Sequence, residues 1–345
     1  MKIINWGIIG LGNIAHEFSK AFAKTKNAKL LAIASKDENK LKKFRQQFNV
    51  DLKFSFKNYQ ELIDCDEVDI VYIALPNSLH KQWVLNAIKN KKNILVEKPA
   101  TINFSEANEI RDHLKKTNIF FSEAFMYRYH PQIQSVIKII KDNKIGNLLS
   151  MESSFGEDIL TKKKLFFFIK KKEIDPKSRK FDKNLGGGCI LDLGCYPSSF
   201  SLLIGLLKNK LNMNSLEIAN VIVEKGETGV DIDSKAELLF QDGFRSKIHA
   251  SFKNNLGSKS VIYGEKGTIC LDNSWSGGNI IVHSKDNSEQ KMSFANNKNI
   301  YGYQIEEISK NLIQGFNKIN FPIMSLEETL LNMKIIDDWL DYCEK

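Results

Sequence analysis

The sequence has little that would place it in a membrane or hold it together by disulfides. Its 345 residues contain no run of about 18 consecutive apolar residues, the length that a membrane-spanning helix needs. The first residues lead directly into a predicted strand, without the cleavage pattern of a signal peptide. The five cysteines form no Cys-x-x-Cys pair, which indicates reduced thiols. We therefore expect a cytoplasmic protein with no membrane contact and no metal site.

An excess of positive charge is present, but it is modest. The chain has 50 Lys and Arg against 41 Asp and Glu, a formal net charge of +9. Such an excess can indicate a polyanionic partner. Here the lysines are spread along the whole chain, and no recognisable nucleic-acid-binding module accompanies them. We expect no nucleic-acid partner, and a length that suits two domains.

A glycine-rich turn follows the first predicted strand. Gly10-Leu11-Gly12-Asn13-Ile14-Ala15 has the G-x-G-x-x-A spacing of a dinucleotide-binding turn, between a strand and a helical pattern. The first glycine permits the tight turn, the second lets the backbone approach a pyrophosphate, and the alanine lets helix pack on strand. The helix N-terminus then offers N–H groups to the phosphates. The predicted cofactor-binding residues of this turn are Gly10, Gly12, Asn13 and Ile14.

The end of the second predicted strand, residues 29–34, indicates which dinucleotide is bound. Ser35 and Lys36 stand where a carboxylate would hold the ribose 2′-hydroxyl of NAD, and both can bind a 2′-phosphate. NADP is therefore favoured over NAD. Asp37 is either a ribose acid in a shifted register or the N-cap of the following helix, and we favour the N-cap.

The loop after the third predicted strand, residues 68–74, would lie at the same sheet edge as the glycine turn. Its candidate cofactor contacts are Leu75, Pro76, Asn77 and His80. A single histidine on a helix is as often a packing or surface residue as a functional one, so His80 has both readings.

The fourth predicted strand ends at Glu97-Lys98-Pro99. In open α/β sheets, ligands bind at the carboxyl ends of the strands. A lysine there can hold a substrate oxygen and move its proton. Lys98 is the predicted catalytic residue if it faces a bound nicotinamide.

The alternation of strands and helices stops after residue 122. We predict an N-terminal Rossmann domain, residues 1–122, and a C-terminal α+β domain, residues 123–345. The second domain would have a large, open, mostly antiparallel sheet, with one face covered by helices or by another subunit. Its expected strands are 147–155, 217–224, 234–240, 245–252, 258–263 and 267–271. Its expected helices are 130–141, 188–204, 303–316 and 326–342.

A segment of basic and aromatic residues, 162–172, stands out in the second half. It predicts a loop whose phenylalanines pack over a cleft and whose lysines are solvated. The alternative is a cover over an anionic substrate.

Four motifs carry a resemblance over essentially the whole chain. They are Gly10 to Ala15, Glu97-Lys98-Pro99, Glu123 to Pro131 (EAFMYRYHP) and Gly186 to Pro197 (GGGCILDLGCYP). With them the chain resembles the Gfo/Idh/MocA oxidoreductase family. It looks most like the branch of dimeric dihydrodiol dehydrogenase, glucose-fructose oxidoreductase and NADP-dependent xylose dehydrogenase, which also has tyrosine at the position of Tyr196, where many members have histidine.

The resemblance implies a dissociable NAD(P) cofactor and a sugar, polyol or cyclic diol substrate. It implies that Lys98 is catalytic, that Glu97 and Arg128 lie near the nicotinamide ribose, and that the Lys98–Pro99 bond is often cis. It also implies a homodimer, or a higher homo-oligomer, formed through the C-terminal sheet.

The helical pattern after the glycines places Asp192 and Tyr196 four residues apart, on one face, with Pro197 expected to kink the helix. An ammonium beside Tyr196 would lower the pKa of the phenol and ease proton exchange with an alcohol. Either Tyr196 transfers the proton and Lys98 tunes it, or Lys98 transfers it. Asp192 either contacts the substrate or orients its neighbours. Arg179 binds a substrate oxygen or is a surface residue.

These residues together predict an NADP-dependent oxidoreductase that interconverts a secondary alcohol and a carbonyl on a sugar, cyclic polyol or dihydrodiol. Two alternatives stay open at this point. The substrate is a nucleotide-linked keto-sugar, or the chain is a non-catalytic NADP-sensing regulator.

Overall fold

The computed structural model describes residues 2–163, 169–208, 211–294, 299–315, 319 and 321–344. The chain divides into two compact units. The first is Met1–His130 with Asn296–Thr329, and the second is Pro131–Ala295 with Leu330–Lys345. The chain therefore leaves the first unit eight residues after the predicted boundary, and it returns to that unit late in the sequence.

The return has a physical cause in the apolar face of one late helix, α8 (Ile300–Ile313). Ile305 and Ile308 on α8 join the same hydrophobic core as Trp6 of the first strand. The indole Nε1 of Trp6 donates to the hydroxyl of Ser309 at 3.0 Å. A contact between residues about three hundred positions apart leaves no local signal in the sequence.

The first unit is a Rossmann-type fold around a six-stranded sheet in the order β3-β2-β1-β4-β5-β6, with every pairing parallel. The strands are β1 (Ile4–Ile9), β2 (Ala28–Ala34), β3 (Ser55–Phe56), β4 (Ile70–Ile73), β5 (Asn93–Val96) and β6 (Phe121–Glu123). The helices besides α8 are α1 (Asn13–Ala21), α2 (Glu38–Phe48), α3 (Tyr59–Asp64), α4 (His80–Lys89) and α5 (Phe104–Leu114). Short 3-10 turns are η1 (Phe22–Lys24), η2 (Leu52–Phe54), η3 (Asn77–Leu79) and η4 (Met126–Tyr129).

Both faces of this sheet are buried, which explains why its strands are almost continuously apolar. Ile8 belongs to one core cluster, shared with Phe18 of α1, and Ile9 belongs to the other, shared with Val84 of α4. The strand order reverses between β1 and β4. Ligands bind outside the carboxyl ends of the strands at such a switch point.

The second unit is built on an eight-stranded sheet in the order β10-β11-β12-β7-β13-β14-β15-β16. Only the β12–β7 pair is parallel, so the prediction of a mostly antiparallel sheet is confirmed. The strands are β7 (Leu148–Gly156), β10 (Leu216–Lys225), β11 (Asp231–Phe240), β12 (Arg245–Ser251), β13 (Ser260–Gly264), β14 (Gly267–Leu271), β15 (Ile280–Ser284) and β16 (Glu289–Met292). The last two were not among the predicted strands.

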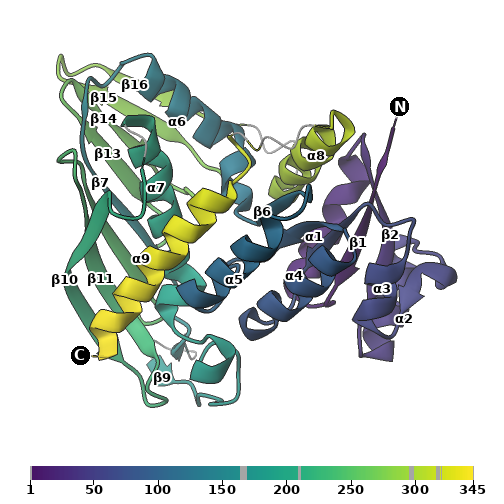
Figure 1. Ribbon diagram of the computed structural model, residues 1–345. Helices are drawn as coiled ribbons and strands as arrows, with labels where there is room; N and C mark the ends of the chain where they lie inside the picture. The colour runs from purple at the N-terminus through teal and green to yellow at the C-terminus, as the bar shows by residue number, and fades with distance from the viewer. Residues whose placement is uncertain are drawn as a thin grey trace. The chain divides into compact units, whose positions relative to one another are not determined.

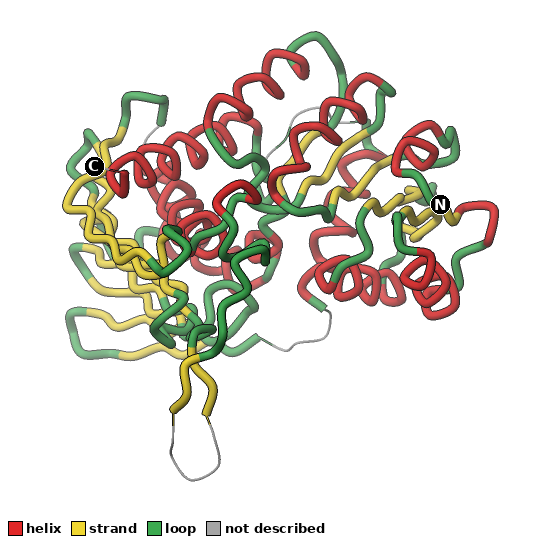
Figure 2. The backbone as a smooth tube through the Cα atoms, turned by 90° about the horizontal axis from the view of Figure 1, so that it is seen from below, coloured by secondary structure: helices red, strands yellow, loops and turns green. Residues whose placement is uncertain are grey.

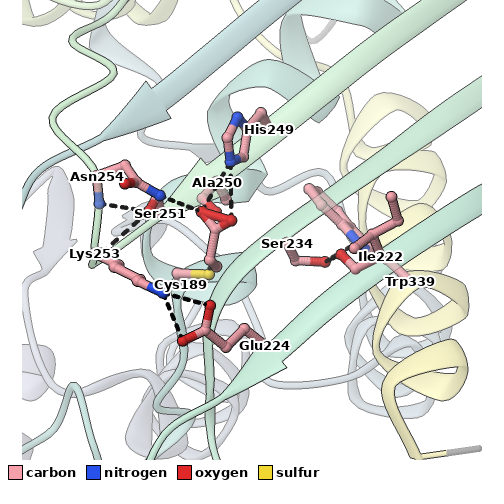
Figure 3. A network of polar contacts seen from close by, with 11 residues as sticks. Cys189, Ile222, Glu224, Ser234, His249, Ala250, Ser251, Lys253, Asn254 and Trp339 are labelled. Atoms are coloured by element: carbon pink, nitrogen blue, oxygen red, sulfur yellow. Dashed lines mark hydrogen bonds and ion pairs between the residues drawn. The ribbon is translucent and has the colours of Figure 1, made fainter.

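Helices cover one face of this sheet, as Figure 1 shows for α6 (Pro131–Lys141), α7 (Cys195–Lys208) and α9 (Leu326–Glu344). The indole Nε1 of Trp339 on α9 donates to Ser234 of β11 at 2.8 Å (Figure 3). The thiol of Cys189 donates to the carbonyl of Ala250 on β12 at 3.4 Å. These contacts fix the helical layer on the sheet.

The basic segment 162–172 contributes a short hairpin of β8 (Thr161–Lys163) and β9 (Ile169–Lys171), which extends away from the large sheet in Figure 2. Residues 164–168 lie outside the described residues. Both the phenylalanines predicted to pack over a cleft and part of the alternative, a cover over an anionic substrate, fall on them.

The apolar segment Lys183–Lys208 is long and apolar enough to cross a membrane, judged by length and composition alone. However, 89% of its most apolar window is buried inside the fold, as in the core helix of a soluble protein. It contains the 3-10 turn η5 (Lys183–Leu185), the π turn η6 (Ile190–Gly194) and α7. Pro197 is the third residue of α7, and the predicted kink there stays a prediction. The irregularity that the structure shows is the π turn η6, which runs directly into α7.

Candidate active site

The glycine turn leaves room where a dinucleotide would lie. Gly10 has φ +89°, and a Cβ there would meet the carbonyl oxygen of Ala74 at 2.4 Å. Gly12 caps α1, and a Cβ on it would meet nothing within 4 Å. No side chain caps this helix, and its first turn, which begins at Asn13 and Ile14, has no acidic residue. The amides of α1 therefore suit a phosphate group.

The residues after β2 favour a phosphorylated ribose. Asp37 is the N-cap of α2, because its Oδ1 accepts from the amides of Asn39 at 2.9 Å and Lys40 at 3.1 Å. The prediction of an N-cap is confirmed, so this carboxylate is engaged by the helix. Ser35 is buried, and Lys36 places its Nζ 5.8 Å from the centre of the Tyr59 ring. The two side chains predicted to bind a 2′-phosphate thus offer a hydroxyl, on Ser35, and an ammonium, on Lys36.

The loop after β4 meets the end of β5 through His80. Leu75 and Pro76 lead into η3, where Asn77 is buried. His80 is 0% exposed, and its ring nitrogens lie 2.8 Å from the carbonyl oxygens of Leu75 and Pro99. A direct cofactor contact through either nitrogen would replace one of these bonds.

Lys98 stands at the carboxyl end of β5, where the sequence predicts it. The neighbouring Glu97 is buried, accepts a hydrogen bond from the hydroxyl of Tyr72 on β4, and accepts from the backbone amide of Lys98 at 3.2 Å. The Lys98–Pro99 peptide bond is cis, as the resemblance implies. Glu97 is therefore fixed by the sheet while Lys98 is less deeply buried than its neighbours.

A second carboxylate, Glu123, lies under this edge and was not predicted as a site residue. It is 0% exposed, and its Oε1 accepts from the amide of Ala100 at 2.9 Å. Burial, reinforced by Glu97, raises its pKa to about 7, although the amide of Ala100, Thr329 and Arg128 act in the opposite direction. The sequence offered one signal, the first residue of the EAFMYRYHP motif, but no hint of burial.

Arg128 lies on η4 and is almost fully buried. Its Nε donates to the carbonyl of Pro322 at 3.0 Å, and its Nη2 pairs with Glu328 at 2.7 Å. The guanidinium therefore ties η4 to the segment that returns late in the chain. That Arg128 lies near the nicotinamide ribose stays a prediction.

In the second unit, Asp192 on the π turn lies between two cations. Its Oδ1 accepts from Nη1 of Arg179 at 3.1 Å, and its Oδ2 lies 3.7 Å from Nζ of Lys180. The carboxylate is 9% exposed, whereas the side chain of Arg179 is 53% exposed. Lys180 was not predicted, and its position next to Arg179 was the only signal available.

Tyr196, one turn further on, is buried among aromatic rings. Its ring centre lies 5.3 Å from that of Phe155, edge to face, and 5.5 Å from that of Trp275. Phe200 also contacts Trp275, at 5.9 Å. These rings hold the phenol ring in place. π turns often occur at functional sites, and this one carries Asp192.

Comparisons with known proteins match an N-terminal and a C-terminal part of the chain. Residues 4–125 match the model of an oxidoreductase family with an NAD-binding Rossmann fold, and residues 133–270 match the C-terminal domain of the same family, Gfo/Idh/MocA. The chain belongs to this oxidoreductase family. The resemblance seen in the sequence is thereby confirmed.

Members of the family similar to this chain have varied substrates. Trans-1,2-dihydrobenzene-1,2-diol dehydrogenase of Xenopus tropicalis is 28% identical over 347 residues, covering 97% of this chain and 96% of that protein. Among solved structures, aldose-aldose oxidoreductase from Caulobacter crescentus, complexed with glycerol, has a TM-score of 0.83 at 21% identity, covering 99% of this chain and 98% of that one. A 3-ketoreductase from Actinomadura kijaniata, in complex with NADP and TDP-benzene, has a TM-score of 0.80 at 21% identity, covering 97% and 96%.

Proposed function

We propose that this chain is an NADP-dependent oxidoreductase that interconverts a secondary alcohol and a carbonyl on a sugar, cyclic polyol or dihydrodiol. The observation that carries the proposal is the position of Lys98, at the carboxyl edge of the same sheet as the Gly10–Gly12 turn. Membership of an oxidoreductase family supports it.

The residues present fit a bound NADP. The amides at the start of α1 would bind the pyrophosphate, and Ser35 and Lys36 the 2′-phosphate, since the nearby carboxylate of Asp37 is occupied as a helix cap. Leu75, Pro76 and Asn77 would line the path toward the nicotinamide, with Glu97 and Arg128 near its ribose. When bound, the nicotinamide supplies the hydride chemistry.

The chain itself holds and moves the proton on the substrate oxygen. We assign this task to Lys98 and Tyr196, because an amine and a phenol can both exchange a proton with an alcohol. Asp192 would contact a substrate hydroxyl or orient its neighbours, and the half-exposed Arg179 would bind a substrate oxygen. If Lys98 and Tyr196 act as a unit, the double variant will be no slower than the slower single variant.

The first experiment is a titration of the pure protein with NADPH and NADH, followed by an absorbance screen with aldoses, inositols, dihydrodiols and keto nucleotide-sugars. We expect tighter binding of NADPH and turnover of one class. Lys98→Met should lower kcat by a factor of about 10²–10⁴, the range of general acid–base catalysis. Lys115→Met, a change at an exposed lysine, is the control. Preference for NADH, or full activity of Lys98→Met, would contradict the proposal.

A second candidate is reduction of a keto group on a nucleotide-linked sugar. It is favoured by the two cations at Asp192, Arg179 and Lys180, since a diphosphate group binds where positive charge is available. Turnover of keto nucleotide-sugars but not of free sugars would select it.

We also propose a cytoplasmic homodimer formed through the uncovered face of the large sheet. A groove of about 580 Å³ lies on this face, and Ile222 in it is 68% exposed. Lysines and glutamates both line the groove, among them Lys235, Glu237 and Lys247. A face with both signs of charge around apolar residues can pair with a second copy of itself about a two-fold axis.

A further inference from the structure

His80 lies buried between two loops that the proposed reaction uses. It is the first residue of α4, and no part of its surface is exposed. Nε2 lies 2.8 Å from the carbonyl oxygen of Leu75, in the loop after β4. Nδ1 lies 2.8 Å from the carbonyl oxygen of Pro99, which directly follows Lys98.

Both of these contacts are made to carbonyl oxygens, which accept hydrogen bonds and cannot donate. A neutral imidazole has one N–H, so in either tautomer the other nitrogen would direct a lone pair at a carbonyl oxygen 2.8 Å away. Only the imidazolium, with two N–H groups, satisfies both contacts. We propose that His80 is held as a buried imidazolium that joins the two loops and is a positioning residue for Lys98.

A buried charge needs compensation by nearby dipoles or opposite charges. The two carbonyl dipoles point at the ring. Two buried carboxylates bind the backbone on either side of Pro99. Glu97 accepts from the amide of Lys98, and Glu123 accepts from the amide of Ala100. On α4 and α5, the charge of Lys81 is already paired with Glu106 and Glu109. Charged groups on the segments around His80 include Lys81, Glu97, Lys98, Glu106, Glu109 and Glu123.

The contact of His80 is one of three hydrogen bonds that hold the backbone around Lys98. The amide of Lys98 donates to Glu97, the carbonyl of Pro99 accepts from His80, and the amide of Ala100 donates to Glu123. The ring also reaches the Leu75 loop, which is proposed to line the cofactor path. The inference rests on the proposed function in one respect, the role of Lys98.

A direct test is the protonation state of the ring. We expect long-range ¹H–¹⁵N spectra of histidine-labelled protein to show two protonated ring nitrogens for His80 at pH 7.5, with or without NADPH. The signals are assigned by their loss in His80→Asn, and the exposed His113 serves as the comparison histidine. A spectrum with one protonated and one bare nitrogen at His80 would overturn the imidazolium.

The positioning role is tested with His80→Asn and His80→Gln. We expect kcat to fall about 10- to 100-fold, as expected when a catalytic group is displaced by about 1 Å. KM for the substrate should change less than threefold, and the NADPH dissociation constant should rise several-fold. Ala87→Gly, at a buried position on the same helix, lowers helix stability without touching His80 and should leave kcat unchanged.

The outcomes separate this inference from the proposed function. Wild-type kcat in both folded His80 variants would refute the positioning role. If the wild-type protein turns over none of the offered substrates while the two N–H signals are present, the proposed function fails and the imidazolium stands. If the His80 variants do not fold, the spectra of the wild-type protein still decide the charge state of the ring. The link between the loops is then tested by raising the pH until one N–H signal of His80 disappears and measuring whether NADPH affinity changes.

Discussion

Glu123 shows how one buried side chain can set the pH response of the first unit. Its Oε2 has no hydrogen-bond partner within the part of the chain that the structure describes. Thr329 lies near enough to lower its pKa without completing a hydrogen bond to that oxygen. The carboxyl is more easily protonated in the folded chain than in the unfolded one, where its pKa is near 4.5.

The sign of the effect follows from the raised pKa. Below about pH 4.5 the Glu123 carboxyl is protonated in both the folded and the unfolded chain, so it costs no stability. Above about pH 7 the folded chain must bury its negative charge. The difference corresponds to roughly 3 kcal/mol of unfolding free energy. Stability contributed at this site therefore falls as the pH rises from about 4.5 to 7.

We predict that Glu123→Gln gains about 2–3 kcal/mol in unfolding free energy relative to wild type when the pH is raised from 5 to 8. Glutamine keeps the acceptor for the amide of Ala100 and cannot ionise. Urea denaturation at the two pH values measures the change. Glu109→Gln, at an exposed position, should show no such trend, and a pH-independent difference for Glu123→Gln would contradict the raised pKa.

At the residue scale, the sequence predicted side chains whose partners are near in the chain. The N-cap role of Asp37 depends on amides two and three residues away, so local spacing was enough. His80 has one partner nearby, Leu75, but its second partner, Pro99, and the partner of Glu123, Ala100, lie 19 and 23 residues away. No local pattern records such contacts.

At the scale of elements, the π turn η6 depends on one strand and one glycine. The amide of Ile190 donates to Oδ2 of Asp231 on β11 at 2.7 Å. Gly188 has φ +114°, and a Cβ there would meet Oδ1 of Asp231 at 2.2 Å. The carboxylate that caps the turn therefore occupies the space that any side chain at 188 would need.

We predict that Gly188→Ala lowers the melting temperature more than Gly229→Ala does. Both glycines have positive φ, +114° and +80°, so both variants carry a backbone cost of about 1–2 kcal/mol. A Cβ at Gly229 meets nothing within 4 Å, whereas at Gly188 the clash adds about 1–3 kcal/mol. Differential scanning fluorimetry compares the two, and equal melting temperatures would show that Asp231 moves aside.

The elements that could be predicted are those with a clear period. Six strands of the large sheet were expected from alternation and turn residues, and each lies within a few residues of its predicted range. β16 carries mostly exposed polar residues, so it has no alternation to detect. The π turn was missed because no local pattern marks it; the partner of its first amide, Asp231, is 41 residues away in sequence.

At the scale of the whole molecule, the uncovered sheet face supplies the main prediction. We expect Ile222→Lys to convert a dimer to a monomer, because it places a charge in the apolar part of the proposed interface. Leu52→Lys is a matched control, since Leu52 is also 68% exposed and lies in the first unit. Light scattering coupled to size-exclusion chromatography at micromolar concentration measures both. A monomeric wild type, or a dimer that survives Ile222→Lys, would contradict the proposal.

The return of residues 296–329 to the first unit has a consequence for synthesis on the ribosome. Trp6 is made before Ser309, which accepts its indole hydrogen bond and follows about three hundred residues later. At 5–20 residues per second, that delay is roughly 15–60 s. During this interval the apolar surface that α8 will cover stays open, so the nascent chain exposes a surface that chaperones can bind until α8 is translated.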